Sequence, residues 1–257
     1  MQTTRRRFLQ ASIAANVSAA FTLPAVGYAT QDSAHMPGGG ELSGVALPGV
    51  RDLFNGKDLT GWVVPPDAGD TWSIRNGVLV CSGRPNGVMR TDRQYENFVL
   101  QVDWMHMEPG GNSGLYVWRG AEARTPGIEI QILDLDWVRL QTKEGNPPPP
   151  IAFVHGEFIA VGGLKFVPDN PRGARSMSIE NRVKGRGEWN TYTVVAVDGT
   201  VKLAVNGKFV NGIARATPKN GYLGLQSEGA EIHFRNIRIM ELPAGVAVAG
   251  PVASGSR

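Results

Sequence analysis

The residues best equipped for chemistry lie in one short stretch, where Glu129 and Gln131 alternate with three isoleucines. Gly127–Asp134 reads Gly-Ile-Glu-Ile-Gln-Ile-Leu-Asp. Successive side chains of an extended strand point to opposite faces, so the isoleucines share one face while Glu129 and Gln131 share the other. A carboxylate can exchange a proton, and an amide can hold a hydroxyl group. The spacing therefore predicts a strand with one core face and one face equipped for acid–base chemistry and hydrogen bonding.

Three further polar residues near this strand could take part in a site. Asp134 breaks the alternation at the strand end, where it could bind a hydroxyl or a cation, or cap a turn. His155 and Glu157 are two residues apart and could face the same way as a metal pair or an acid. Two ligands are too few to specify a metal site. A divalent cation stays an option, and the sequence requires no cofactor.

The stretch upstream carries aromatic and polar side chains. Tyr116 and Trp118 are two residues apart and would share a strand face, either as a platform for sugar rings or as core. Asn112 and Ser113 are typical of turns, and Asn112 could also reach a sugar hydroxyl. Arg119 offers several fixed donors to a developing oxyanion, or could form a structural ion pair with Glu129.

The rest of the central region reads almost entirely as strands. Residues 98–104 and 191–197 alternate between apolar and polar side chains. Asn206-Gly207 predicts a tight hairpin, and a phase flip near Asn236 predicts a bulge. No amphipathic helix is expected after the N-terminal segment. With 33 glycines and 17 prolines, these short strands predict an all-β sandwich.

The N-terminus resembles a twin-arginine export signal. Arg5-Arg6-Arg7 precede a moderately apolar run, and a small-residue cleavage site follows at Gly27-Tyr28-Ala29. Polar residues and a proline interrupt the run, so no stable membrane anchor is expected after cleavage. The protein is therefore expected in the periplasm or outside the cell. Without the three arginines the chain has 23 basic and 23 acidic residues, which gives no reason to expect nucleic acid as a partner.

The predicted organisation is a signal peptide (1–29), a flexible linker (30–49), one domain (50–242) and a disordered tail (243–257). Within the domain, Pro147–Pro150 should form an exposed extended loop. Lys165–Arg186 carries six basic residues and reads as a solvated loop in preference to an anion site. The single cysteine, Cys81, is expected to be a small buried apolar residue.

Eight ordered motifs carry a resemblance to a known family. They are Leu53–Trp62, Trp72–Leu79, Asn112–Gly114, Gly127–Asp134, Glu188–Asn190, Val205–Gly207, Gly224–Gln226 and Phe234–Ile237. In this order they resemble the 3-keto-disaccharide hydrolase domain family. The resemblance implies a concanavalin A-like jelly roll and a carbohydrate substrate.

The family's reaction is hydrolysis of a glycoside whose sugar has been oxidised to a ketone at carbon 3. Such a ketone acidifies the hydrogen on carbon 2, so a base can remove it while the substituent on carbon 1 leaves; water then adds back. This route needs a base, a donor to the enolate oxygen and an acid for the leaving group. Glu129, which lies in the family-like motif and on the polar face of its strand, is the predicted base. Arg119 and Asp134 are predicted as further catalytic residues, and Gln131 as a contact to a sugar hydroxyl.

The sequence departs from the family pattern at two places. A Leu-Gln-Asp-His-Gly run of the family is here Leu225-Gln226-Ser227-Glu228-Gly229, so a role of that histidine would pass to Glu228 or be lost. Gln226 stays a candidate for sugar binding. A Thr-Gly-Ala-Ile-Tyr-like segment is replaced by one that contains His155.

Two other functions remain open at this point. The spacing Glu129-x-Gln131-x-x-Asp134 is similar to the Glu-x-Asp-x-x-Glu motif of laminarinase-type glucanases, which need two carboxylates about 5 Å apart. A carbohydrate-binding domain could use the same polar face without turnover. The sugar, its linkage and the oligomeric state are not specified by the sequence.

Overall fold

The computed structural model describes residues 49–122, 124–142 and 155–246. The predicted signal peptide, the Pro147–Pro150 loop, nearly all of the linker and most of the tail lie outside these residues. Within them, no helix is long and apolar enough to cross a membrane.

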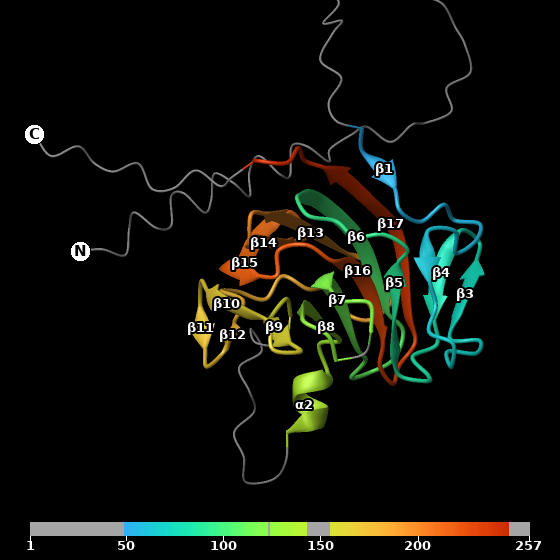
Figure 1. Ribbon diagram of the computed structural model, residues 1–257. Coiled ribbons are helices and arrows are strands. Elements are labelled where there is room, and N and C mark those ends of the chain that lie inside the picture. Colours follow the sequence, from blue (N-terminus) through green and yellow to red (C-terminus); the bar gives the residue numbers. More distant parts are fainter. Residues whose placement is uncertain (1–48, 123, 143–154, 247–257) are drawn as a thin grey trace, which may run out of the picture.

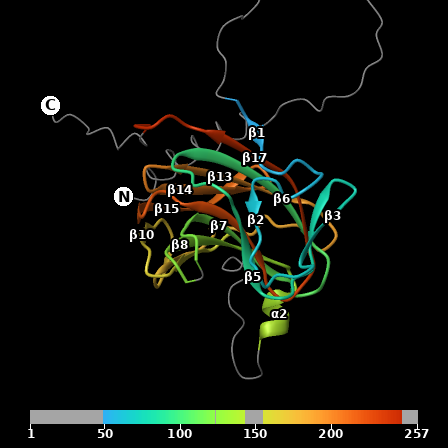
Figure 2. The same cartoon turned by 45° about the vertical axis from the view of Figure 1, so that its right-hand side comes forward.

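Two antiparallel sheets pack face to face, as Figures 1 and 2 show. In spatial order, the first sheet contains β10 (Lys165–Pro168), β15 (Lys208–Thr217), β14 (Thr200–Val205), β13 (Asn190–Val197), β6 (Phe98–His106), β17 (Ile232–Glu241), β4 (Val78–Cys81) and β3 (Trp72–Arg75), with β1 (Arg51–Asp52) paired to β17. The second contains β11 (Pro171–Arg172), β12 (Arg175–Ser176), β9 (Phe158–Val161), β8 (Gly127–Leu133), β7 (Asn112–Arg119), β16 (Tyr222–Ser227), β5 (Gly87–Thr91) and β2 (Trp62–Val63). The chain crosses between the two sheets repeatedly, for example from β4 to β5 and from β9 to β10, and the two packed antiparallel sheets confirm the predicted concanavalin A-like jelly-roll sandwich.

The core lies between the two sheets and includes the predicted apolar face of β8. Ile128, Ile130 and Ile132 are fully buried there, as are Leu79 and Phe98 from the first sheet. Cys81 is also fully buried, and burial raises the pKa of its thiol, as expected for an inert core residue. The opposite face of β8 is therefore left for the polar side chains.

Two predicted backbone irregularities are confirmed. Asn206 and Gly207 both have positive φ and close the β14–β15 hairpin. Asn236, with φ of 49°, lies where the pairing of β17 with β6 shifts register. Its side-chain amide donates to Asp103 Oδ2 at 2.7 Å.

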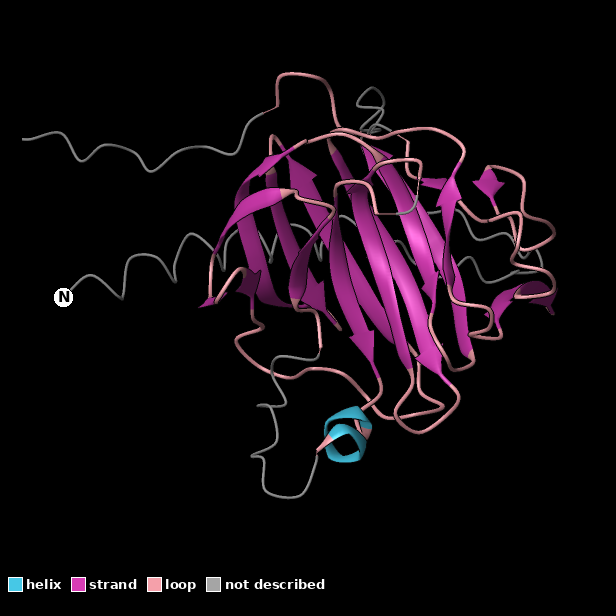
Figure 3. Ribbon diagram, turned by 60° about the horizontal axis from the view of Figure 1, so that its bottom comes forward, coloured by secondary structure: helices cyan, strands magenta, loops and turns pink. Residues whose placement is uncertain are grey.

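Two expectations about loops are wrong. A short helix, α2 (Trp137–Gln141), lies at one end of the sandwich (cyan in Figure 3), where no helix was expected. It forms because the Asp134 carbonyl accepts the N–H of Trp137, and because Val138 packs on Leu133. The basic stretch Lys165–Arg186 contains β10, β11 and β12 and is not merely a solvated loop.

Candidate functional site

The register of the second sheet aligns side chains from four strands into one row. Glu129 on β8 pairs with Tyr116 on β7, Tyr116 pairs with Gly224 on β16, and Gly224 pairs with Arg90 on β5. Cross-strand partners face the same side of a sheet. The row of Glu129, Tyr116, Gly224 and Arg90, called the Glu129 row below, therefore lies on the outer face of the second sheet.

A parallel row contains the predicted hydroxyl contacts. Gln131 pairs with Gly114, and Gln226 pairs with Val88. A Cβ atom at Gly114 would lie 2.9 Å from Gln226 Oε1, which shows that these residues are neighbours across β7 and β16. The sheet thus brings Glu129, Gln131 and Gln226 together although they are far apart in the sequence.

Glu129 is a buried carboxyl group whose pKa is shifted far from its ordinary value. Only 9% of the residue is exposed, and the Tyr116 hydroxyl donates to its Oε2 at 3.1 Å. Burial raises the pKa of Glu129 to about 7, against the opposing effects of the Tyr116 hydrogen bond and the positive charge of Arg175. A carboxyl group with this pKa is present in both protonation states at neutral pH, which suits a general base.

Tyr116 is buried beside Glu129 and stays protonated. Burial and the charge of Glu129 both raise its pKa well above the ordinary value. Its hydroxyl also accepts a long hydrogen bond of 3.5 Å from Gln226 Nε2. Tyr116 therefore acts as a fixed donor to Glu129, and the predicted sugar-stacking role stays a prediction.

Gln226 presents an unused acceptor to the site. Its Oε1 atom is buried and has no hydrogen-bond partner among the residues that the structure describes. A buried acceptor without a partner costs free energy, about 1–3 kcal/mol, unless a ligand or water satisfies it. The carbonyl of Gln226 is thus suited to accept a hydrogen bond from a sugar hydroxyl.

Glycines occupy the centre of both rows. A Cβ atom at Gly114 would lie 2.8 Å from Glu129 Oε1, and one at Gly224 would lie 2.7 Å from Val88 Cγ1. Any side chain at either position would fill the space between Glu129 and the neighbouring strands. Gly114 and Gly224, called the glycine floor below, therefore leave room for a ligand against the sheet.

We expect the Gly114→Ala variant to lose activity while staying folded. The new methyl group would contact the ends of the Glu129 and Gln226 side chains, which can move, so the carboxylate is displaced and the backbone is not. Misplacement of a catalytic group by about 1 Å costs on the order of 100-fold in rate. Turnover and the urea midpoint would be measured beside Gly185→Ala, where the new methyl group meets nothing closer than 3.7 Å. Full activity of Gly114→Ala would contradict the proposed crowding.

Gln131 and Asn112 are hydrogen-bonded to each other. Gln131 Nε2 donates to Asn112 Oδ1 at 2.7 Å and to the Ser113 carbonyl at 3.1 Å. Both residues are only partly buried and border the glycine floor. Their roles in sugar binding stay predictions.

Arg119 lies beside Tyr116 and does not pair with Glu129. Its Nη1 donates to the carbonyls of Gly120 and Ala121 at 3.1 and 3.5 Å, and its guanidinium carbon lies 5.6 Å from the centre of the Tyr116 ring. Within the described ranges Arg119 forms no ion pair with Glu129, so the structural alternative for these two residues is wrong. Burial lowers the pKa of Arg119, and the charge of Arg90 lowers it further.

Three charged residues at the other end of the face were not singled out together from the sequence. Arg172 Nε and Arg175 Nη1 donate to the two carboxylate oxygens of Glu157, each at 3.0 Å. Glu157 is almost fully buried, while both arginines are partly exposed. Local sequence could not predict this cluster, because the β11–β12 hairpin brings the arginines to β9.

Glu228 lies close enough to influence the site electrostatically. Burial raises the pKa of its carboxyl group, and its negative charge contributes to the raised pKa values of Glu129 and Tyr116. A histidine in its place would have the opposite influence. Its predicted contact with substrate stays a prediction.

The structure corrects the prediction for Trp118. Trp118 has φ of 52°, and the pairing of β7 with β16 shifts register between Tyr116 and Arg119. This bulge turns Trp118 into the core, where it is fully buried and its indole N–H donates to the Glu96 carbonyl at 2.9 Å. Trp118 therefore cannot form a sugar platform with Tyr116.

Asp134 is also separate from the site. Its carboxylate accepts the backbone N–H groups of Gly110 at 2.8 Å and Asp136 at 3.0 Å, so it caps the turn before α2. It is five residues from Glu129, which is roughly 17 Å along a strand. The two carboxylates cannot form the pair that a retaining glucanase needs, about 5 Å apart. The catalytic role predicted for Asp134 has no support in this geometry and stays a prediction.

His155 does not share a face with Glu157. Gly156, with φ of 79°, breaks the alternation between them. His155 is 1% exposed and lies in the electrostatic neighbourhood of Asp134 and His106, whose ring lies 3.2 Å from the Ile132 carbonyl. The expectation that His155 and Glu157 face the same way is therefore wrong, and the contact of His155 with substrate stays a prediction. The described residues contain no group of three or more metal-ligating side chains.

The two buried histidines should make the fold sensitive to acid. Burial lowers the pKa of both His106 and His155 from 6.5 to about 4, against the opposing charge of Asp134. As the pH falls from 6.5 towards 4, the unfolded chain binds protons that the folded chain excludes, so stability is lost over that interval. The expected loss is about 2 kcal/mol per histidine at pH 5.

Urea unfolding of the wild type and of His155→Gln at pH 7 and pH 5 checks this expectation. The difference in unfolding free energy between pH 7 and 5 should be smaller in the variant. Effects of other groups, including Glu129, cancel in this comparison. If the unfolding free energy changed equally between pH 7 and pH 5 in both proteins, His155 would not be a cause of the acid sensitivity.

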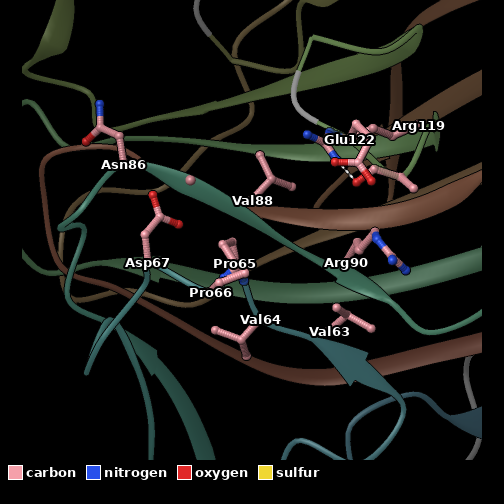
Figure 4. A pocket seen from close by; sticks show the side chains of 12 residues that line it. Val63, Val64, Pro65, Pro66, Asp67, Asn86, Val88, Arg90, Arg119 and Glu122 are labelled. Carbon is pink, nitrogen blue, oxygen red and sulfur yellow. Dashed lines mark hydrogen bonds between the residues drawn. The ribbon is translucent and has the colours of Figure 1, made fainter.

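An open pocket of about 450 Å³ adjoins the Glu129 row at the β2–β5 edge of the second sheet (Figure 4). Arg90 and Arg119 line it together with valines and prolines of residues 63–66 and with Val88. Glu129 does not line this pocket. Tyr116 lies between Glu129, its cross-strand partner, and Arg119, which lines the pocket. The outer face thus combines a reactive carboxyl group, a glycine floor and an adjacent pocket.

Comparison with known proteins identifies the family and relatives with the same fold. Residues 49–240 match the model of a family described as the 3-keto-alpha-glucoside-1,2-lyase-like domain. A 3-keto-disaccharide hydrolase of Bacteroides thetaiotaomicron is 22% identical over 261 aligned positions, which cover 79% of this chain and 83% of the relative. Two crystal structures of candidate glycosyl hydrolases from Parabacteroides distasonis share the fold. Their TM-scores are 0.59 and 0.55 at 23% and 24% identity, with coverage of 76% of this chain in both cases and 94% and 100% of theirs.

Proposed function

Because the chain belongs to the 3-keto-alpha-glucoside-1,2-lyase-like family, a family of glycosyl hydrolase-like proteins that act on carbohydrates, we propose that it cleaves glycosides whose sugar carries a ketone at carbon 3. The raised pKa of Glu129, on the strand with the family-like motif, is the observation that carries the proposal. An acidified carbon–hydrogen bond needs a base that is ionised at neutral pH yet strong enough to accept the proton.

In the proposed reaction, the Glu129 carboxylate removes the proton from carbon 2. The electron pair of that bond forms a double bond between carbons 1 and 2, and the substituent on carbon 1 leaves with its oxygen. The leaving oxygen takes up the proton that Glu129 removed, directly or through water, which restores the carboxylate. Water then adds its oxygen to carbon 1 and a proton to carbon 2. Addition of water after elimination gives the same products as hydrolysis.

The neighbouring side chains fit the other requirements of this reaction. Tyr116 holds Glu129 by a hydrogen bond and keeps its own proton, so it cannot compete as a base. Gln226 offers an unused carbonyl to a sugar hydroxyl. Arg119, beside Tyr116, supplies a positive charge near the oxygen atoms that gain charge during elimination.

To test this proposal, rates of nitrophenol release would be measured for a 4-nitrophenyl 3-keto-glucoside and for its unoxidised parent, with and without a chelator. Release of nitrophenol from the keto substrate alone supports elimination, because only the ketone acidifies carbon 2. Equal release from both substrates would favour ordinary glycosidase chemistry. Loss of activity with the chelator would add a divalent cation to the site. We also propose export by the twin-arginine route, which a reporter fused to residues 1–29 would test.

A further inference from the structure

The pocket at the β2–β5 edge has a character different from that of the Glu129 face. One apolar wall is made by Val63, Val64, Pro65, Pro66 and Val88, polar side chains lie at the two ends, and no aromatic residue is part of the lining. We infer that this pocket binds the group that leaves from carbon 1 of the sugar, and that it selects an aryl group, bonded through a phenolic oxygen. The inference rests on the proposed function, because it needs the sugar at Glu129.

The position of the pocket fits a leaving-group subsite. Arg90 lies in the Glu129 row, three strands from Glu129, with Gly224 of the glycine floor between them. The backbones of β8 and β5 are about 14 Å apart. Their side chains shorten this gap, because Glu129 Oε1 would lie 2.8 Å from a Cβ atom at Gly114 and Val88 Cγ1 would lie 2.7 Å from one at Gly224. A sugar with its carbon 2 at Glu129 would therefore direct its carbon 1 substituent over Gly224 towards Arg90 and Val88.

The chemistry of the wall favours an aryl ring over a second sugar. Valine and proline side chains offer no hydrogen bonds, so sugar hydroxyls placed against them would lose water without compensation. Sugar rings are usually held by aromatic platforms and polar groups, and such aromatics are absent from the lining of this pocket. An aryl ring would instead bury apolar surface against Val88 and the two prolines.

Arg119 is the arginine of the pocket that lies nearer to Glu129, beside Tyr116, where it can meet a phenolic oxygen. Arg90 stacks on Tyr222, with its guanidinium carbon 4.1 Å from the ring centre, and donates to the Thr91 carbonyl at 2.9 Å. Neither Arg90 nor Arg119 forms an ion pair with any carboxylate in the described part of the chain. Guanidinium groups hydrogen-bond to oxyanions and stack on aromatic faces.

The two ends of the pocket differ in charge, which sets the direction of the ligand. Figure 4 shows Arg90, Arg119 and Glu122 at one end, with one more positive than negative charge, and Asp67 and Asn86 at the other. The arginine end adjoins Tyr116, on the side of Glu129. During elimination the electron pair of the carbon 1–oxygen bond moves to the phenolic oxygen, which leaves as phenolate. The Arg119 guanidinium faces that charge, while the ring passes Arg90 and Val88 and points towards Asp67 and Asn86.

The test compares phenyl and methyl 3-keto-glucosides, each as the α- and the β-anomer, in the wild type, Val88→Asp and Val63→Asp. Both valines are partly exposed, so a charge at either should be tolerated by the fold. The matched control is Val167→Asp, an exposed valine of β10 in the first sheet. Comparing the phenyl-to-methyl ratio of kcat/KM between variants cancels the different intrinsic reactivity of the two leaving groups.

We expect Val88→Asp to lower this ratio at least tenfold, with a smaller drop in Val63→Asp and none in Val167→Asp. An unchanged ratio in both pocket variants would overturn the inference and leave the proposed function standing. If the wild type cleaves none of the keto-glucosides, the proposed function fails. In that case, calorimetric titration with unoxidised phenyl and methyl β-glucosides measures binding to the pocket independently of turnover. Tighter binding of the phenyl compound that is lost in Val88→Asp supports the pocket, and equal binding overturns it.

Discussion

Replacing Glu129 by glutamine is expected to lower turnover of a 3-keto-glucoside about 1,000-fold, the usual contribution of a positioned general base. Glutamine keeps the shape of the side chain and can still contact the Tyr116 hydroxyl, but it cannot accept a proton from carbon 2. The rate of the wild type should also rise with pH through an apparent pKa near 7, because the reactive form is the carboxylate. Initial rates from pH 5 to pH 9 measure both effects.

Glu96→Gln is the control for this variant, because Glu96 is an exposed carboxylate outside the outer face. It should keep the activity and the pH profile of the wild type. Substrate affinity of Glu129→Gln should change little, since only the base is removed. Retained turnover in Glu129→Gln would remove Glu129 from the proposed reaction. Ligand binding without turnover in the wild type would favour a carbohydrate-binding domain.

The same substitution is expected to stabilise the folded protein at alkaline pH. Folding raises the pKa of Glu129 from 4.5 to about 7, so the folded state favours the neutral carboxyl group. That contribution to stability is fully present below pH 4.5 and is lost as the pH rises through 7. Glutamine is neutral at every pH and avoids this loss. At pH 8 the variant should be more stable than the wild type by as much as about 3 kcal/mol.

Urea unfolding at pH 4.5 and pH 8 measures this difference. At pH 4.5 the two proteins should have nearly the same stability, because both carry a neutral group at position 129. The gap should open only at the higher pH, whereas Glu96→Gln should follow the wild type throughout. A gap of the same size at both pH values would mean that its cause is packing and not ionisation.

The parts of the fold that sequence predicted well are those fixed by local patterns. The three isoleucines of β8 predicted its buried face, and Asn206-Gly207 predicted the β14–β15 turn. The phase flip at Asn236 predicted the bulge in β17. Each of these features depends on residues within a few positions of one another, so a short stretch of sequence is enough to predict it.

The errors arose where the backbone leaves a regular strand. A single positive φ at Trp118 inverted the face on which the indole lies. Gly156 likewise separated His155 from Glu157. These conformations depend on how neighbouring strands pack, which residue spacing alone does not specify.

The wider site could not be assembled from sequence for a different reason. Arg90 and Arg175 belong to strands far from Glu129 in the sequence, and sheet register brings them to the same face. Register is set by long-range pairing and by the burial of whole faces. The resemblance to a family pointed to Glu129 but not to the arginines on either side of it.

The bulge in β7 lets one strand place three side chains in a way that a regular strand could not. Tyr116 and Arg119 pair with Gly224 and Tyr222, so three steps on β7 match two steps on β16. In a regular strand, residues three positions apart face opposite sides of the sheet. The bulge instead keeps Tyr116 and Arg119 on the same outer face and adds the large indole of Trp118 to the core. One backbone conformation thus provides a bulky core residue and a neighbouring tyrosine and arginine for the site.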